Sequence, residues 1–330
     1  MAEFLTFDTD LTAVANAIRA KGGTSAQLIY PSGFVSAIQA IQTGITPKLV
    51  VTTTPGAAIT ATPAEGFKVV KGTAGADGMC TLELPKAGTW HVTAMANSVS
   101  NSQNIVIGTQ NMLLPLYHDT FADNTWEEII AVCRTGIAPD SWAVGDSKTM
   151  NIGGTAYQVD IIGKNHDEYA DGSGTAPLTF QLHDCYSEAK QMYSTNLSGL
   201  GWKNTDMRLT YLPAILALMP AEVQNGIRAV NKKTSEGGNS TTIEIVSDTL
   251  FLLSEVEIFG TASSSVAGEG SQYDYYKAGN PKIKKREGVD EFWWERSSAS
   301  GGMFCRVRAN GQAGASNASS SLGVSFAFCF

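Results

Sequence analysis

The chain has 330 residues, of which 43% are hydrophobic and only 16% are charged, against roughly a quarter charged in a typical globular protein. Its net charge of −8 argues against a nucleic-acid-binding protein, because such proteins neutralise phosphates with clustered Lys and Arg. No apolar run approaches the roughly 20 residues of a membrane span, and no basic segment precedes an apolar stretch at the N-terminus, so a secretory signal is not expected. Length and composition predict a soluble, multi-domain protein rich in strands and loops, made in a cytoplasm.

Residues 1–45 predict a helical hairpin. Apolar residues within 11–18 recur at spacings of three and four behind a cap at Asp8 or Asp10, and residues 35–41 repeat this period. Isolated helices of this length are only marginally stable in water, so either the next domain or other copies of the chain must cover their apolar faces. Self-association, and hence an assembly role, is the favoured interpretation.

Residues 46–112 predict an all-β sandwich. Six short runs alternate apolar and polar residues between Gly-containing turns, at the spacing of a small antiparallel sandwich. The runs begin at Lys48, Ala58, Phe67, Cys80, Trp90 and Asn104. The segment 84–94 resembles the closing strands of small immunoglobulin-like modules, which serve as spacers in bacterial surface and phage structural proteins. His91 is expected to face solvent.

Residues 113–330 predict an α+β domain with irregular loops. Thr125 and Glu128 have the spacing of a capping box, which predicts a helix start ahead of Ile129. Helices are also predicted within 207–218 and from Pro220 to Gly226. Strands are predicted at 157–162, 178–182, 292–296, 303–308 and 323–330, and at 250–253, where the buried strand leads into the apolar run 255–260.

Tests for catalytic chemistry are mostly negative. The sequence has no phosphate-binding loop and no nucleophile elbow. Three His-Asp dipeptides, at 118–119, 166–167 and 183–184, lack a partner at helical spacing, so surface or turn residues are expected rather than metal ligands. The acidic loop at 167–174 could bind Ca²⁺ weakly, but it lacks the spacing of an EF-hand. No metal or cofactor is expected.

Three further clusters allow a functional and a structural interpretation. Glu255 and Glu257 alternate in an apolar run and could support glycoside hydrolysis, although a buried salt bridge is favoured. The aromatic residues of Tyr273–Lys277 could stack on sugars, although a core role is favoured. The cysteines have no C-x-x-C spacing and predict buried free thiols. Of these, Cys305 and Cys329 both lie in predicted apolar strands.

The stretch from Arg296 to the end is the most informative part of the sequence. It contains no acidic residue and consists mostly of Ser, Ala, Gly and Asn, punctuated by aromatic and β-branched residues. A period of two places Arg306 and Arg308 on one face of a strand, opposite Cys305. Together these features predict a rigid frame that displays a loop of small polar residues at 309–321, where binding residues are commonly found.

The same residues carry a resemblance to a known family. The matching segments are Phe251–Gly260, Gly268–Tyr276, Trp293–Ser297 and Phe304–Cys329. They resemble the C-type-lectin-like domain of phage tail and minor structural proteins, some of which are diversified by diversity-generating retroelements. This resemblance covers about residues 120–330, and the opening segment Thr9–Thr24 is similar to the start of such tail proteins.

The resemblance implies a lectin-like fold that binds its ligand without calcium through its C-terminal strands and loops, in a homotrimer. Residues 298–317 are rich in the amino acids that adenine-directed mutagenesis produces, and the variable-type segment would span about 294–330. The exposed ligand-binding candidates are Ser298, Ser300, Gly302, Met303, Arg306, Arg308, Asn310, Gln312, Ala315, Ser316 and Asn317. The scaffold candidates are Trp293, Trp294, Phe304 and Phe326.

The expectation is therefore a non-enzymatic phage tail protein that attaches to bacterial surface receptors. Residues 1–45 would assemble the chain with its copies and other tail proteins, 46–112 would form an immunoglobulin-like spacer, and 113–330 a C-type-lectin-like receptor-binding domain. The receptor would be a protein or a glycan, and the chain would reside in the virion tail. The alternatives are a bacterial surface adhesin and a tail-associated glycan hydrolase.

Overall fold

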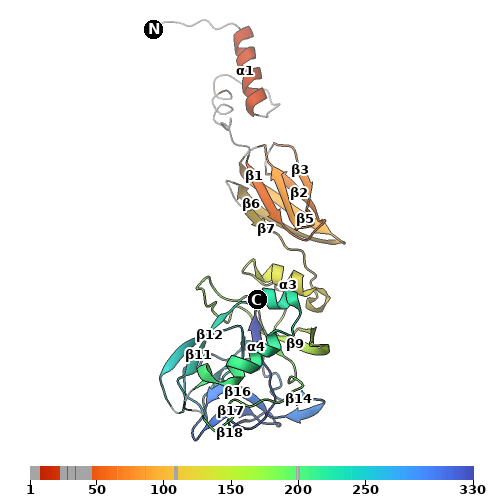
Figure 1. The fold of residues 1–330 in the computed structure, drawn as a ribbon. Helices are drawn as coiled ribbons and strands as arrows, with labels where there is room; N and C mark the ends of the chain where they lie inside the picture. The colour runs from red at the N-terminus through yellow and green to blue at the C-terminus, as the bar shows by residue number, and fades with distance from the viewer. Residues whose placement is uncertain are drawn as a thin grey trace, which may run out of the picture. The chain divides into compact units, whose positions relative to one another are not determined.

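The computed structural model describes residues 8–22, 28, 34, 47–64, 66–85, 87–107, 111–197, 199, 201–238 and 240–330. The chain divides into two compact units, Met1–Tyr117 and His118–Phe330. Both contain several short strands arranged in separate sheets, and the second unit adds short helices (Figure 1). The protein is thus mostly β with an α+β second unit. No helix within the described ranges is long and apolar enough to cross a membrane.

The first unit begins with helix α1, Asp8–Gly22, where the sequence predicts it. Ala15 and Ile18 are buried, as the apolar spacing requires, and they pack with Phe34. Val14 is 48% exposed on another side of the helix. The second predicted helix, at 35–41, lies outside the described residues.

The rest of the first unit is a sandwich of two sheets around one core. The three-stranded sheet has the order β4-β1-β7 and the four-stranded sheet the order β3-β2-β5-β6. The strands are β1 Lys48–Thr52, β2 Ala58–Pro63, β3 Val70–Thr73, β4 Met79–Glu83, β5 Gly88–Ala96, β6 Val99–Ile107 and β7 Asn111–Leu113. Alternate residues of both sheets bury a single apolar cluster around Trp90. All six predicted runs contain a strand, and the short β7, parallel to β1, was not predicted. His91 is exposed, as expected.

The second unit contains four sheets and several short helices. A five-stranded sheet has the order β13-β19-β10-β9-β8, a three-stranded sheet the order β16-β17-β18, and β11-β12 and β14-β15 are two-stranded. The strands are β8 Ser147–Ile152, β9 Thr155–Gly163, β10 Thr179–Leu182, β11 Val230–Ser235, β12 Ile243–Asp248, β13 Leu250–Phe251, β14 Lys284–Arg286, β15 Val289–Glu291, β16 Trp293–Ser298, β17 Met303–Val307, β18 Ala313–Asn317 and β19 Ala327–Cys329. The helical elements are η1 Phe121–Asp123, α3 Trp126–Cys133, η2 Trp202–Asn204, the π-helix η3 Met207–Tyr211, α4 Leu212–Leu216, α5 Ala221–Gly226, α6 Glu255–Phe259 and α7 Asp274–Lys277.

Local sequence signals account for the starts of α3 and α5. Thr125 and Glu128 form the predicted capping box: the Thr125 Oγ accepts from the Glu128 amide at 3.2 Å and the Glu128 carboxylate accepts from the Thr125 amide at 2.7 Å. Helix α5 begins directly after Pro220, also as predicted. The predicted helix at 207–218 is a π-helical turn followed by α4, so it is helical but not one continuous α-helix.

One local prediction is wrong. The alternating run at Glu255 is a helix, α6, and not a continuation of strand β13. Ser254 and Glu257 form a second capping box, with amide-to-side-chain distances of 3.0 and 3.1 Å, and Gly260 ends the helix at a positive φ of 77°. Five residues are too few for apolar periodicity to separate helix from strand.

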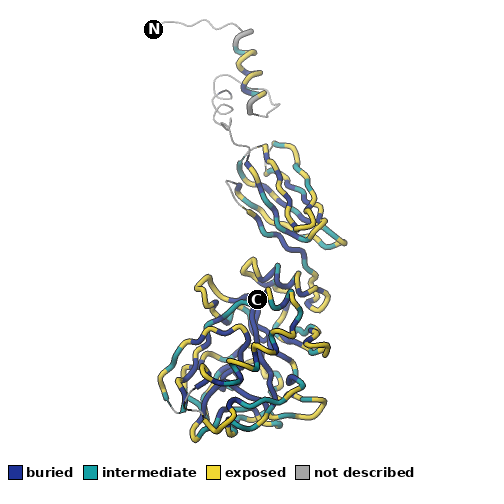
Figure 2. Tube along the Cα trace, in the orientation of Figure 1, coloured by how far each residue is buried: buried dark blue, intermediate teal, exposed yellow. Residues whose placement is uncertain are grey.

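The C-terminal strand is an internal strand of the five-stranded sheet in the second unit. Strand β19 pairs antiparallel with both β10 and β13, and the rings of Phe180 and Phe328 stack with centroids 5.2 Å apart. Only Ala327–Cys329 of the predicted strand 323–330 forms ladder bonds, but the whole segment is buried. Figure 2 shows buried chain through the middle of this unit and exposed chain along its outer loops.

Candidate binding surface

The sheet β16-β17-β18 provides the rigid frame for the candidate surface. Trp293 and Trp294 of β16 are fully buried, and their indole nitrogens donate to the carbonyl oxygens of Lys282 and Lys190 at 2.9 and 2.8 Å. Phe304 is fully buried on β17, and so is Phe326. The prediction that these four aromatic residues are scaffold is confirmed.

Two arginines project from this frame near its exposed end. The Arg306 guanidinium stacks on the Phe292 ring at 4.1 Å, and its Nε donates to the Ala315 carbonyl at 3.2 Å. The Arg308 Nε donates to the Ala313 carbonyl at 3.1 Å. Within the described part of the chain, neither guanidinium forms an ion pair. Partial burial, followed by repulsion from the like charge of Arg308, lowers the pKa of Arg306.

A short turn fixes the backbone beside these arginines. The Arg308 amide donates to the Gln312 carbonyl at 2.7 Å, and the Asn310 side-chain amide donates to the Gln312 side-chain oxygen at 3.0 Å. Gly311 adopts a positive φ of 81° and packs close to Ile283. We call Arg306, Arg308, Phe292 and the turn 309–312 the arginine surface.

The predicted loop at 309–321 is therefore wrong in its extent. Residues Ala313–Asn317 form strand β18, which pairs in register with all of β17, from Met303 opposite Asn317 to Val307 opposite Ala313. Small Ala, Gly and Ser residues have weak strand propensity, but pairing with an anchored neighbouring strand overrides it. The irregular part is confined to the turn 309–312 and to the segment after Asn317.

The candidate residues do not share one face. Directly opposed residues of a ladder lie on the same face, so Met303, Ala315 and Asn317 lie with Cys305, whereas Ser316 lies with Arg306. Ser300, Arg308, Asn310, Gln312 and Asn317 are exposed, and Gly302, Met303, Arg306, Ala315 and Ser316 are partly buried.

The prediction that Ser298 is exposed is wrong. Only 2% of this residue is accessible, and its hydroxyl donates to the Gly238 carbonyl at 3.2 Å. A loop remote in sequence covers this end of β16, and no local pattern indicates it. Gly302 is also constrained, because a Cβ there would lie 2.3 Å from the Asn196 carbonyl oxygen.

The two carboxylates considered for hydrolysis, Glu255 and Glu257, are buried and bonded to other side chains or backbone amides of the protein. Glu257 pairs with both Arg296 and Lys232, the latter at 2.7 Å, which confirms the salt-bridge interpretation for this residue, whereas Glu255 forms no ion pair with the described residues. Burial raises the pKa of Glu257, but these two positive charges outweigh it and leave the pKa below its usual value. Glu255 accepts hydrogen bonds from Ser263, Ser264 and Ser265, and neither carboxylate reaches solvent.

The other sequence candidates are also structural. Asp167 is buried and bonded to Lys232 at 2.7 Å, so its assignment to the surface or a turn is wrong, and Asp171 pairs with Arg228 at 2.6 Å. Two of the three carboxylates of the acidic loop considered for Ca²⁺, those of Asp167 and Asp171, are therefore ion-paired, and no group of His, Cys, Asp or Glu within the described ranges is arranged to hold a metal. Tyr273, Tyr275 and Tyr276 are core residues, which confirms the structural interpretation.

The cysteines are all buried free thiols, as predicted. They are Cys80, Cys133, Cys185, Cys305 and Cys329. Cys305 lies in β17 and Cys329 in β19, which belong to different sheets, so this pair forms no bridge.

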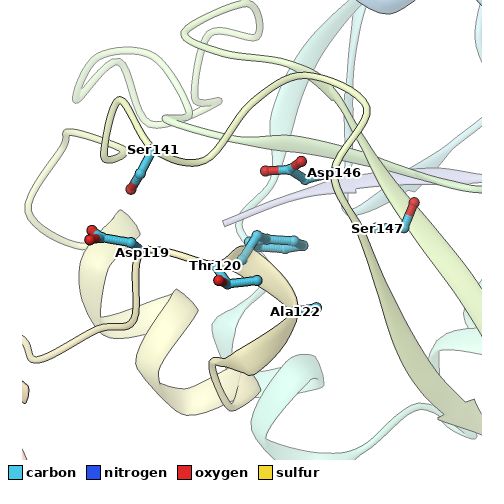
Figure 3. Close-up of a pocket in the computed structure, with 7 residues that line it drawn as sticks. Asp119, Thr120, Ala122, Ser141, Asp146 and Ser147 are labelled. Carbon is cyan, nitrogen blue, oxygen red and sulfur yellow. The ribbon is translucent and has the colours of Figure 1, made fainter.

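A cavity of about 380 Å³ lies beside η1, away from the arginine surface. Figure 3 shows Asp119 and Ser141 at one end of it and Asp146 and Ser147 at the other. The Asp146 carboxylate accepts from the Ala143 amide at 2.8 Å, and the Ser147 hydroxyl donates to Asp160 at 2.6 Å. No histidine, lysine or arginine is among the described residues that line this cavity, so no cationic side chain is present there to bind an anion.

Comparison with known proteins adds one match. Residues 179–330 match a family model described as a domain of unknown function, DUF6273. The matched region contains β10, β19 and the whole of the sheet β16-β17-β18. No curated protein and no solved structure matches the chain.

Proposed function

We propose that the chain is a non-enzymatic phage tail protein that attaches to a bacterial surface receptor, a protein or a glycan. In this proposal, residues 113–330 form a C-type-lectin-like head and the sandwich is an immunoglobulin-like spacer. The N-terminal segment assembles the chain, as a homotrimer, with other tail proteins in the virion. The sequence resemblance supports this proposal, together with a C-terminal strand, β19, held between β10 and β13.

The observation that carries the proposal is the pair Arg306 and Arg308. Both arginines belong to the hairpin of β17 and β18. Strand β17 also pairs with β16, which the buried Trp293 and Trp294 anchor, so little conformational entropy is lost when a ligand binds. Neither guanidinium has a carboxylate partner in the described part of the chain. A receptor with an acidic group would relieve their mutual repulsion and gain charge-assisted hydrogen bonds.

The proposed diversification concerns the exposed positions of this surface. Retroelement mutagenesis would be tolerated at Ser300, Asn310, Gln312 and Asn317, which lie at the exposed ends of the hairpin, and not at the buried Ser298. Sequencing of the neighbouring DNA tests this. The proposal predicts a near-copy of the 3′ end of the coding sequence that differs at adenines, beside a reverse transcriptase.

The binding proposal is tested by replacing both arginines with alanine and measuring attachment of the full chain to host cells. A charge-assisted hydrogen bond contributes about 1.5–3 kcal/mol, so losing two predicts at least a tenfold weaker attachment. Lys285→Ala is the matched control, because Lys285 is an exposed cation on the separate β14-β15 hairpin. Unchanged attachment by a folded Arg306→Ala, Arg308→Ala variant would reject the arginine surface as the binding site.

A further inference from the structure

Glu295 is a buried carboxyl group with no partner among the described residues. It lies in β16 between Trp294 and Arg296, and none of it is accessible to solvent. Neither of its side-chain oxygens has a hydrogen-bond partner in the part of the chain that the structure describes. Buried carboxylates are normally paired with cations or hydrogen-bond donors. Glu257 in α6 shows the usual arrangement, because it pairs with the cations of Lys232 and Arg296. An isolated negative charge at Glu295 would have no such compensation.

The groups around Glu295 do not supply a positive charge. Glu255 from α6 and Glu269 from the segment before α7 act on it with like charge. Cys305 from β17 and Tyr276 from α7 also interact with it electrostatically, and both are buried and neutral. These groups therefore oppose ionisation of Glu295.

The nearby cations either pair with other carboxylates or lie on the other face of the sheet. Arg306 of β17 directly opposes Trp294 in the ladder, so it lies on the face opposite that of Glu295. Strand β11, which packs on β16, carries Lys232, and this ammonium lies 2.7 Å from both Asp167 and Glu257. In η2, Lys203 pairs with Glu244 at 2.9 Å. The Arg296 guanidinium, adjacent in sequence, binds Glu257 and backbone carbonyls.

We infer that Glu295 is a neutral, protonated carboxylic acid in the folded protein, and that its ionisation at high pH loosens the sheet β16-β17-β18. Burial, followed by the charges of Glu255 and Glu269, raises the pKa of Glu295 well above its usual value. Burial also raises the pKa of Glu269, whose Oε2 has no hydrogen-bond partner among the described residues.

This protonation makes the stability of the second unit depend on pH in a defined direction. The folded state holds a proton that the unfolded chain releases above the ordinary Glu pKa, so stability is greatest below that pH and falls as the pH rises toward the folded-state pKa. Each pH unit in that window lowers the folding constant by up to about tenfold per proton. The contribution of Glu295 to the stability of the sheet that carries the arginine surface is hence largest at acidic pH.

The test compares the full-length wild type with Glu295→Gln by denaturant unfolding between about pH 5 and pH 9, followed by tryptophan fluorescence. Trp293 and Trp294 directly precede the substituted residue in β16 and report on this sheet. The inference predicts that the folding constant of the wild type, relative to Glu295→Gln, falls by about tenfold per pH unit. Glu127→Gln, an exposed residue of the same unit, serves as control and should follow the wild type.

A ratio that stays constant across this range would overturn the inference. Infrared spectroscopy of the wild type gives a second measurement that does not depend on the variant folding. The protonated carboxyl should produce a carboxylic-acid carbonyl band at neutral pH, where ordinary Asp and Glu are ionised. Absence of that band from the folded wild type would also overturn it.

Discussion

Arg296 holds several segments of the second unit together from a fully buried position. Its guanidinium binds both carboxylate oxygens of Glu257, with Nη2 2.9 Å from Oε1. It also donates to the carbonyl oxygens of Lys233, Leu252 and Glu269, at distances between 2.8 and 3.3 Å. These acceptors belong to β11, to the segment after β13, to α6 and to the segment before α7. One side chain therefore satisfies the buried polar groups of four segments.

Replacing Arg296 with Met removes all of these donors and keeps most of the side-chain volume. Breaking a buried ion pair from one side costs about 3–5 kcal/mol, because the remaining charge stays buried. Each of the three carbonyl oxygens that loses its donor adds about 1 kcal/mol or more. The total, about 6–8 kcal/mol, is comparable with the whole stability of about 5–15 kcal/mol of a typical domain. We expect Arg296→Met to leave the second unit at the edge of unfolding.

Denaturant unfolding of the full chain, followed by tryptophan fluorescence, measures this loss. Arg134→Met is the matched control, because Arg134 is exposed at the end of α3 and its replacement should change stability by no more than about 0.5 kcal/mol. A loss of less than about 1 kcal/mol for Arg296→Met would refute the argument, since it would show that the buried carbonyls and Glu257 find other partners.

Two further predictions concern acid stability and backbone strain. Burial raises the pKa of Asp167, but the charge of Lys232 outweighs this effect and lowers the pKa to about 2. The ionised Asp167 therefore stabilises the fold at a pH above the pKa that it has in the unfolded chain. This contribution is lost as the pH falls toward 2. Acid unfolding should therefore show less pH dependence between about pH 4 and pH 2 in Asp167→Asn than in the wild type, and equal slopes would contradict the assignment. Gly302→Ala should cost about 1–3 kcal/mol in denaturant unfolding, because φ is +76° and the new Cβ would lie 2.3 Å from the Asn196 carbonyl oxygen. Gly301 has a similar φ of +67°, but a Cβ there would have no atom closer than 3.8 Å, so Gly301→Ala should lower the stability less than Gly302→Ala. An equal loss of stability in the two variants would contradict the steric part of this argument.

The sequence predicts most elements whose determinants are local. The capping box at Thr125, the strands of the sandwich and the burial of Trp293 and Trp294 follow from spacing and composition. The helix α6 carries an equally local signal, Ser254 three residues before Glu257, but the alternating apolar residues of the run favoured a strand.

The features that sequence reasoning missed depend on contacts between residues remote in the chain. Arg296 was included in an acid-free, surface-like stretch, yet its carboxylate partner Glu257 lies 39 residues earlier. Ser298 is covered by the loop at Gly238, 60 residues away. Strand β18 forms because β17 is already anchored, although its own residues have weak strand propensity. In each case the tertiary partner, and not the local pattern, determines burial.

The central claim is that the arginine surface binds the bacterial receptor. The most direct test is the ratio of host-cell attachment between Arg306→Ala, Arg308→Ala and the control Lys285→Ala, with both proteins shown to be folded. The proposal predicts that the double variant attaches at least about tenfold more weakly than the control. Equal attachment by the two proteins would contradict it.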